Sequence, residues 1–272
     1  MARAGEAQAR IRAFYDEVLG AGRLTRLGEL CAPTYTPHLP TFARGSGLAP
    51  GLEALRARLI ASGPMPHRLA RIIADGDLLF AHVLYEAPVP VAGVDVYRLD
   101  ATARIGEHWS VRQPYPHGAA EYDTCFGDAV AADAAFPHDS TWVRSRLERM
   151  LRELWAQGRP ELVPQYYAGS YVQHNPDLPG GYERIERMVR KDIRRYMERT
   201  GGDFPIRIHH LAAQGDFACV HLSIFMAGLD RDEGARSTNV DIFRVDRSGC
   251  MTEHWDVLQI DGVALPDGVP LF

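Results

Sequence analysis

Two segments near the end of the chain combine the side chains that acid–base chemistry uses. The stretch Glu253-His-Trp-Asp256 places an imidazole and a carboxylate two residues apart, and Asp241 precedes it in another strand-like stretch. Residues two apart on a β-strand share one face of the sheet. A carboxylate beside an imidazole fixes its tautomer and raises its basicity. The pattern therefore indicates proton transfer by Asp256, His254 and Asp241.

The turn between these two strands sets which residues face each other. If residues 247–248 form its tip, Asp241 lies opposite His254 and Asn239 lies opposite Asp256. All four side chains then share one face. We expect that face to look into a concavity lined by helices.

The chain contains this arrangement twice. Residues 94–100 (VDVYRLD) return as residues 240–246 (VDIFRVD), and Glu-His-Trp returns at the same spacing of 146 residues. Tyr35-Thr-Pro-His38 likewise returns as Tyr171-Val-Gln-His174. The period is too long for a solenoid of short repeats and fits two compact domains.

The first copy keeps only part of the candidate site. The same turn rule, applied about residues 101–102, places Asp95 opposite His108. However, Leu39 stands at the position of Asn175, and Ser110 stands at the position of Asp256. We therefore expect the second copy to hold the more complete site and the first to be a scaffold or a site with altered chemistry.

Other histidines recur between the copies. His82 and His221 lie in the middle of apolar strands, and His38 and His174 follow the helices where the chain enters the expected pocket. A histidine on a strand is often a structural residue with its hydrogen bonds satisfied, but the recurrence favours a pocket role. We expect His174 and His221, with Asn175, to stabilise a developing enolate or oxyanion; Asn175 is also a turn-former before proline.

Periodicity predicts the same order of elements in each copy, three helices followed by strands. The helices are expected at residues 6–19, 24–31 and 52–60, and again at 140–157, 160–167 and 182–197. The strands are expected at residues 71–74, 78–84, 94–100 and 105–111, and again at 206–212, 217–225, 240–246 and 251–259. Each copy is thus an α+β domain of three helices on a curved antiparallel sheet. We expect domains at 1–118 and 140–272, joined by a connection at 119–139.

Composition limits the partners. The 272 residues are 46% hydrophobic and 24% charged, with a net charge of −5, as in ordinary globular proteins. The arginine-rich stretch at residues 184–199 mixes both signs, which favours a solvated helix face over nucleic-acid binding. Four cysteines without a CxxC spacing, and no apolar run of membrane length, favour a cytoplasmic protein that binds neither nucleic acid nor membrane.

Motifs for cofactors are missing from the sequence. It has no GxGxxG, P-loop, GxSxG or HExxH pattern, so we expect no nucleotide cofactor. His174, His221, His254 and Asp241 have side chains suited to zinc or iron. They have no diagnostic spacing, and we assign neither a metal nor a cofactor.

Several segments, in this order, resemble the SnoaL-like branch of the nuclear transport factor 2-like superfamily. They are Tyr171-Val-Gln-His-Asn-Pro, Ala212-Ala-Gln-Gly-Asp with Val220-His221, Val240-Asp-Ile-Phe-Arg and Glu253-His-Trp-Asp-Val-Leu-Gln. The resemblance covers residues 140–262 and, more weakly, 6–113. It implies cone-shaped domains with one deep pocket each, paired through their sheets as an intrachain pseudo-dimer, in a monomer or low-order homo-oligomer. Tyr171 then joins Asn175 and Asn239 as a substrate-binding residue.

The superfamily hosts polyketide cyclases, ketosteroid isomerases, epoxide hydrolases, dehydratases and binding proteins, so fold alone does not choose among them. We expect a cofactor-independent acid–base enzyme that cyclises, isomerises or dehydrates a small apolar carbonyl compound of natural-product metabolism. Three alternatives stay open: a hydrolase of an epoxide or other strained ring, a metal-dependent variant, and a non-catalytic ligand-binding protein.

Overall fold

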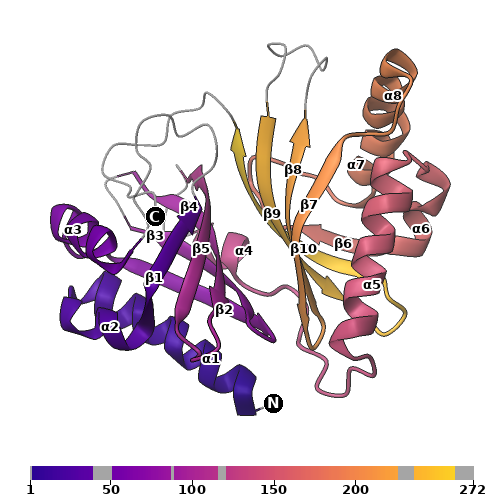
Figure 1. Cartoon of the computed structure of the whole chain (residues 1–272). Helices are drawn as coiled ribbons and strands as arrows, with labels where there is room; N and C mark the ends of the chain where they lie inside the picture. The colour runs from indigo at the N-terminus through magenta and orange to yellow at the C-terminus, as the bar shows by residue number, and fades with distance from the viewer. Residues whose placement is uncertain (1, 39–50, 87–88, 116–120, 226–235, 261–272) are drawn as a thin grey trace. The chain divides into compact units, whose positions relative to one another are not determined.

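The structure is a computed structural model that describes residues 2–38, 51–86, 89–115, 121–225 and 236–260. These residues form two compact units, one within Met1–His117 and the other within Gly118–Asp261 (Figure 1). The expected pairing of the two units through their sheets stays a prediction.

The first unit has helices followed by strands, as its α+β pattern predicts. Its helical segments are α1 (Ala2–Ala13), continued by π-helical turns at Phe14–Gly20 (η1), then η2 (Leu24–Arg26), α2 (Leu27–Leu30) and α3 (Leu52–Ser62). Its strands are β1 (Cys31–His38), β2 (His67–Asp75), β3 (Leu78–Tyr85), β4 (Val91–Leu99) and β5 (Ile105–Pro114). Gly76, with φ of +65°, permits the two-residue turn between β2 and β3.

The second unit repeats this order. Its helical segments are α4 (Tyr122–Phe126), α5 (Ser140–Met150), η4 (Leu151–Ala156), η5 (Pro160–Leu162), α6 (Val163–Tyr166), α7 (Tyr182–Arg187), η6 (Met188–Ile193) and α8 (Arg194–Thr200). Its strands are β6 (Tyr167–Gln173), β7 (Ile206–Gln214), β8 (Phe217–Phe225), β9 (Arg236–Val245) and β10 (Met251–Ile260). Helix α4 belongs to the stretch that the sequence indicated as a connection.

Each sheet has five strands, in the orders β1-β5-β4-β3-β2 and β6-β10-β9-β8-β7. The sheets are mixed, because the edge strands β1 and β6 run parallel to β5 and β10 while all other pairs are antiparallel. The sequence did not indicate these edge strands. In β1 the reason is Pro33 and Pro37, which cannot donate to a ladder and which an edge strand tolerates.

The register of the last hairpin differs from the prediction. Asp256 lies opposite Asp241, His254 lies opposite Phe243, and Leu258 lies opposite Asn239. The predicted oppositions of Asp241 to His254 and of Asn239 to Asp256 are therefore wrong by two residues. In the first unit the same error applies, since Ser110 rather than His108 lies opposite Asp95.

Two local features cause the shift. The turn is longer than two residues, because the backbone N–H of Asp246 bonds to the carbonyl of Cys250 across it. A β-bulge at Thr252 then adds one residue to β10. A shift of two keeps every side chain on its original face, so Asp241, His254 and Asp256 still project from one face.

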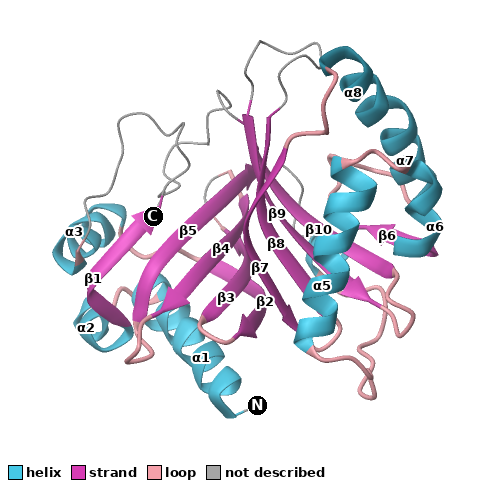
Figure 2. Ribbon diagram, turned by 45° about the vertical axis from the view of Figure 1, so that its right-hand side comes forward, coloured by secondary structure: helices cyan, strands magenta, loops and turns pink. Residues whose placement is uncertain are grey.

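Helices cover that face and form the core with it. In the first unit Ile11 and Phe14 pack into one apolar cluster with Leu55, and in the second Val143 and Leu147 pack into another. Figure 2 shows α5 lying along the sheet of the second unit, where it contacts β7 and β8. No helix in the described residues is long and apolar enough to cross a membrane.

Candidate active site

The second unit holds a cavity of about 560 Å³ between the helical segments η4, α7, η6 and α8 and the inner face of the sheet. Its size is typical of small-molecule sites, and its walls are mainly apolar. Six of the apolar wall residues are Leu151, Trp155, Ile185, Met188, Leu222 and Phe243.

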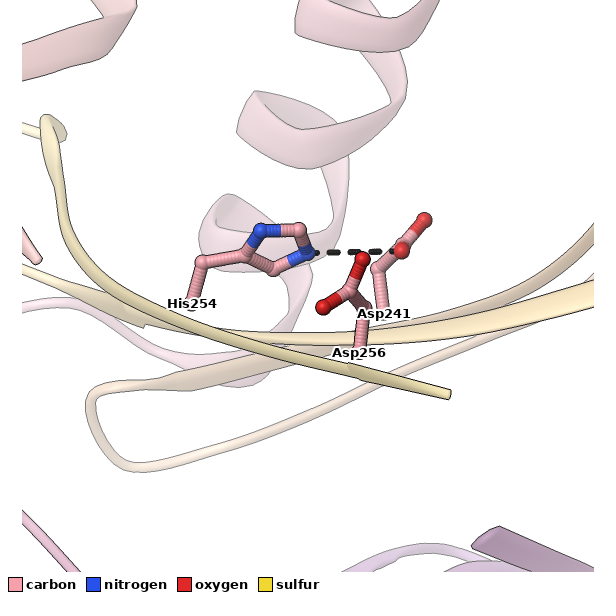
Figure 3. Close-up of side chains that lie close together, drawn as sticks. All are labelled: Asp241, His254 and Asp256. Carbon is pink, nitrogen blue, oxygen red and sulfur yellow. Dashed lines mark hydrogen bonds and ion pairs between the residues drawn. The ribbon is translucent and has the colours of Figure 1, made fainter. Parts of the chain in front are cut away.

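Three titratable side chains lie on the sheet side of this cavity: Asp241 on β9, and His254 and Asp256 on β10. His254 Nε2 is 3.3 Å from Asp241 Oδ1 (Figure 3). One ligating atom from each of the three residues lies within 4.8 Å of the other two. The structure therefore brings together the acid–base residues that strand alternation placed on one face.

Gln173, at the end of β6, fixes the tautomer of His254. Its Oε1 accepts the backbone N–H of Asn175 at 3.0 Å, so its amide N–H group points the other way. The Nε2 atom of Gln173 lies 3.0 Å from His254 Nδ1 and donates a hydrogen bond to it. Nδ1 is then an acceptor, and the ring proton lies on Nε2, which donates to Asp241.

The cavity shifts the pKa of both proton carriers. Burial, reinforced by the nearby Asp241 carboxylate, raises the pKa of Asp256 to about 6, although His254 acts in the opposite direction. Burial alone would lower the pKa of His254, but the carboxylates of Asp256 and Asp241 outweigh it and raise that pKa. Gln173 opposes this rise, because its donation to Nδ1 favours the neutral ring.

Three buried polar atoms near this group have no hydrogen-bond partner among the described residues: Asp256 Oδ1, Asn239 Oδ1 and Tyr171 Oη. Asn239 lines the cavity, and the Tyr171 ring lies 6.3 Å from the ring of His254, centre to centre. Burial raises the pKa of Tyr171 well above its usual value, so its hydroxyl stays protonated and able to donate. Asp256 and Asn239 line the cavity, so their unpartnered atoms can bind the polar group of a ligand, whereas Tyr171 is not among the lining residues.

Asn175 has a structural role. Its Oδ1 accepts the backbone N–H of Asp177 at 3.0 Å, which forms the turn after β6. Its Nδ2 lies 3.4 Å from the backbone carbonyl of Asp256 and braces β10 at the candidate base. Asn175 thus positions Asp256 and Gln173 in addition to shaping the turn.

His174 does not lie in the cavity, so its predicted role at an oxyanion is wrong. Its Nε2 is 2.9 Å from Glu253, and its ring stacks on Trp255 at 4.6 Å. Both partners alternate with His254 and Asp256 along β10 and therefore project from the opposite, outer face. His174 Nδ1 also donates to the backbone carbonyl of Thr124 in α4.

The first unit repeats this outer cluster. His38 Nε2 is 2.8 Å from Glu107, and its ring stacks on Trp109 at 4.4 Å. His38 therefore has no place on the inner face either. His82 also lies on the outer face, because it pairs with Val94, and it bonds to Arg71.

His221 was likewise predicted to line the pocket, and this prediction is wrong. It pairs with Val240, which alternates with Asn239 and Asp241 and so faces away from the cavity. A bulge in β7 brings His209 and His210 beside it, and the Nδ1 atoms of His210 and His221 lie 3.1 Å apart. Burial and these two neighbours lower the pKa of His221 to about 3.

The inner face of the first unit holds an ion pair. Asp95 Oδ1 is 2.7 Å from Arg112 Nη1 and 3.1 Å from His108 Nε2, and Asp95 Oδ2 accepts the hydroxyls of Tyr15 and Tyr85. Burial would raise the pKa of Asp95, but Arg112 and His108 hold it well below its usual value. The carboxylate therefore stays ionised at neutral pH and is enclosed by its partners.

Two residues that shape these sites were not among the predicted ones. Gln173 sets the tautomer of His254, whereas Pro37 stands in its place in the first copy and Tyr35 bonds to His108 Nδ1 instead, at 2.8 Å. Arg112 was also missed. Its counterpart is Leu258, and a charged residue aligned with an apolar one is a signal that comparison of the copies could have found.

Asp241, His254 and Asp256 are also the one group of metal-ligating side chains found close together within the described residues. A metal on His254 Nε2 would require the ring proton on Nδ1, with an acceptor facing it. Gln173 presents an N–H donor there instead. The residues that support the imidazole therefore do not fit a metal, and they suit proton transfer better.

A model of the SnoaL-like domain matches the chain twice, over residues 11–108 and 147–254. The chain belongs to the SnoaL-like family. The two matches confirm the predicted tandem copies, and the predicted α+β fold class is confirmed as well. No curated protein matches the chain.

Solved structures of SnoaL-like and related folds each align with less than half of the chain. TsrD from Streptomyces laurentii is 22% identical, and the alignment covers 44% of this chain and 90% of the TsrD chain, with a TM-score of 0.35. An LEH-like epoxide hydrolase from M. tuberculosis is 17% identical, with 41% and 85% covered and a TM-score of 0.34. An NTF-2-like protein of unknown function from Burkholderia xenovorans is 14% identical, with 47% and 97% covered and a TM-score of 0.37.

Proposed function

We propose that the second unit is a cofactor-independent acid–base catalyst that acts on a small, largely apolar molecule with a carbonyl group. Asp256 carries this proposal. Its carboxyl lies in an apolar cavity beside a second carboxyl, and its pKa is raised to about 6. A group whose pKa lies near neutrality can both accept and donate a proton at working pH.

Each side chain then has a distinct task. Asp256 removes a proton from the carbon beside the carbonyl, and the side-chain amide of Asn239, which lines the cavity, donates to the oxygen on which negative charge develops. Asp241 maintains the basicity of Asp256 and orients His254. A positioned acid–base group contributes about 10²- to 10⁴-fold to the rate.

The test measures the proton transfer itself, because cyclisation, isomerisation and dehydration can all begin with it. A panel of apolar ketones is incubated with the full chain in D₂O, and exchange of the protons beside the carbonyl is followed by NMR. We expect exchange with wild type and a loss of about 10²-fold or more in Asp256→Asn. Asp192→Asn, at the exposed end of the same cavity, is the matched control and should keep the rate.

If ketones bind without exchange in wild type, the protein is a ligand-binding module and the proposal is wrong. The unpartnered atoms of Asp256 and Asn239 also suit a water poised to open a strained ring. Incorporation of ¹⁸O from solvent into the product of an epoxide substrate would assign the cavity to that hydrolysis instead.

A further inference from the structure

Three arginines line the cavity of the second unit. Arg184 lies on α7, and Arg195 and Arg199 lie on α8. Arg195 and Arg199 are four residues apart, so they share one side of the helix. Both are exposed, and neither has an ion pair with a carboxylate within the part of the chain that the structure describes.

The two ends of the cavity therefore differ in charge. The end on the sheet holds Asp241 and Asp256 beside His254, which is only 9% exposed, and the exposed end holds Arg195 and Arg199 with Asp192. Arg184 is half-buried, and its charge lowers the pKa of Asp256, so it belongs to neither end. An anion near the two carboxyls would be repelled, whereas an anion near a guanidinium gains paired, charge-assisted hydrogen bonds. Between the two ends the walls are apolar.

We infer that the ligand of this cavity is an apolar molecule with a carboxylate or a phosphate at one end. Arg195 and Arg199 hold the anionic group at the exposed end, and the apolar body lies along the walls. This arrangement points the opposite end of the ligand at Asp256. Only that last step rests on the proposed function, because binding of the anion requires no catalysis.

The test compares three probes that share a ten-carbon chain: decanoate, monodecyl phosphate and the neutral decanamide. Binding to the full chain is measured by calorimetry, with the fluorescence of Trp155 in the cavity wall as a second readout. We expect both anions to bind wild type more tightly than decanamide. In the double variant Arg195→Gln/Arg199→Gln, the affinity for the anions should fall about tenfold, while that for decanamide stays unchanged.

The matched control is Arg187→Gln/Arg194→Gln, which removes the same charge from exposed arginines that do not line this cavity. It should leave all three affinities unchanged. Tighter binding of the phosphate identifies phosphate esters as the ligand class, and tighter binding of decanoate identifies carboxylic acids; both support the inference. Equal affinity of wild type for decanoate and decanamide, no binding of either, or an equal loss in the control overturns it.

Asp256→Asn separates this inference from the proposed function. The variant should keep the preference for anions even though it loses proton exchange. A preference for anions in a wild type that exchanges no protons would contradict the catalytic proposal alone. Proton exchange without any preference for anions would contradict the ligand class alone.

Discussion

Replacing Asp241 with asparagine is expected to lower the pKa of Asp256. The two residues are cross-strand partners, and their carboxyls lie within 4.8 Å of each other. Two full charges at that distance, at an effective dielectric constant of 20, repel by about 3.5 kcal/mol. The whole rise in the pKa of Asp256, from 3.8 to about 6, corresponds to only about 3 kcal/mol.

Burial is the largest cause of that rise, and the Asp241 carboxylate is a smaller one that His254 opposes. We expect Asp241→Asn to lower the pKa of Asp256 by about one pH unit, or about 1.4 kcal/mol. This is less than the full Coulomb value because the side chain of Asp256 is only half-buried, and solvent screens charges that are partly exposed. At pH 6 the ionised fraction should rise from about half to about nine-tenths.

The pKa can be measured without a substrate, by NMR titration of the chain labelled with ¹³C at the aspartate carboxyl carbons. Asp256→Asn identifies the resonance, and Asp192→Asn tests whether removal of any carboxylate from the cavity gives the same shift. An unchanged or higher pKa of Asp256 in Asp241→Asn would refute the reasoning, because burial alone would then set its value.

Asp95→Asn should leave the buried charge of Arg112 unpaired and destabilise the first unit by about 3–5 kcal/mol in urea unfolding. The folded-state pKa of Asp95 is depressed, so its stabilisation is present above its unfolded pKa, near 3.8, and is lost as the pH falls below that value. His174→Ala should reduce the unfolding free energy by about 1–3 kcal/mol yet leave proton exchange within about twofold; a loss comparable to that of Asp256→Asn would restore His174 to the catalytic group. Gln173→Leu should raise the pKa of His254, because the donor that favours the neutral ring is gone. The pKa can be measured by ¹⁵N NMR of the imidazole, and an unchanged value would contradict this expectation.

The composition of the inner face could be predicted from sequence because strand alternation has a period of two. The error in register was two residues, so Asp241, His254 and Asp256 kept their common face. The contact of each imidazole with its predicted carboxyl also survived, at 3.3 Å for His254 and Asp241. The directly opposite residues could not be predicted in the same way. A bulge such as that at Thr252 depends on the paired strands rather than on one residue type, and it decides that Asp256 lies opposite Asp241.

The four histidines outside the sites were misplaced for a different reason. The face of His221 depends on how β8 pairs with β9, and the sequence offers no short turn motif from which to predict that pairing. The face of His174 depends on β6, which the sequence did not indicate as a strand. Recurrence in both copies showed that these positions are structurally constrained, but it did not show on which side of the sheet they lie.

The contrast between the two inner faces explains why only one of them is suited to proton transfer. In the first unit Arg112 neutralises Asp95, and Gly93 makes room for it, since a Cβ there would lie 2.7 Å from the guanidinium. In the second unit Leu258 replaces that arginine, and a second carboxylate replaces Ser110.

Two carboxyls beside one imidazole, without the guanidinium, form an arrangement that costs stability and raises the pKa of Asp256. The first unit instead compensates the charge of its carboxylate fully. Such a local conflict between charge and burial is expected where a fold serves function rather than stability. It is the physical ground for placing the chemistry in the second copy.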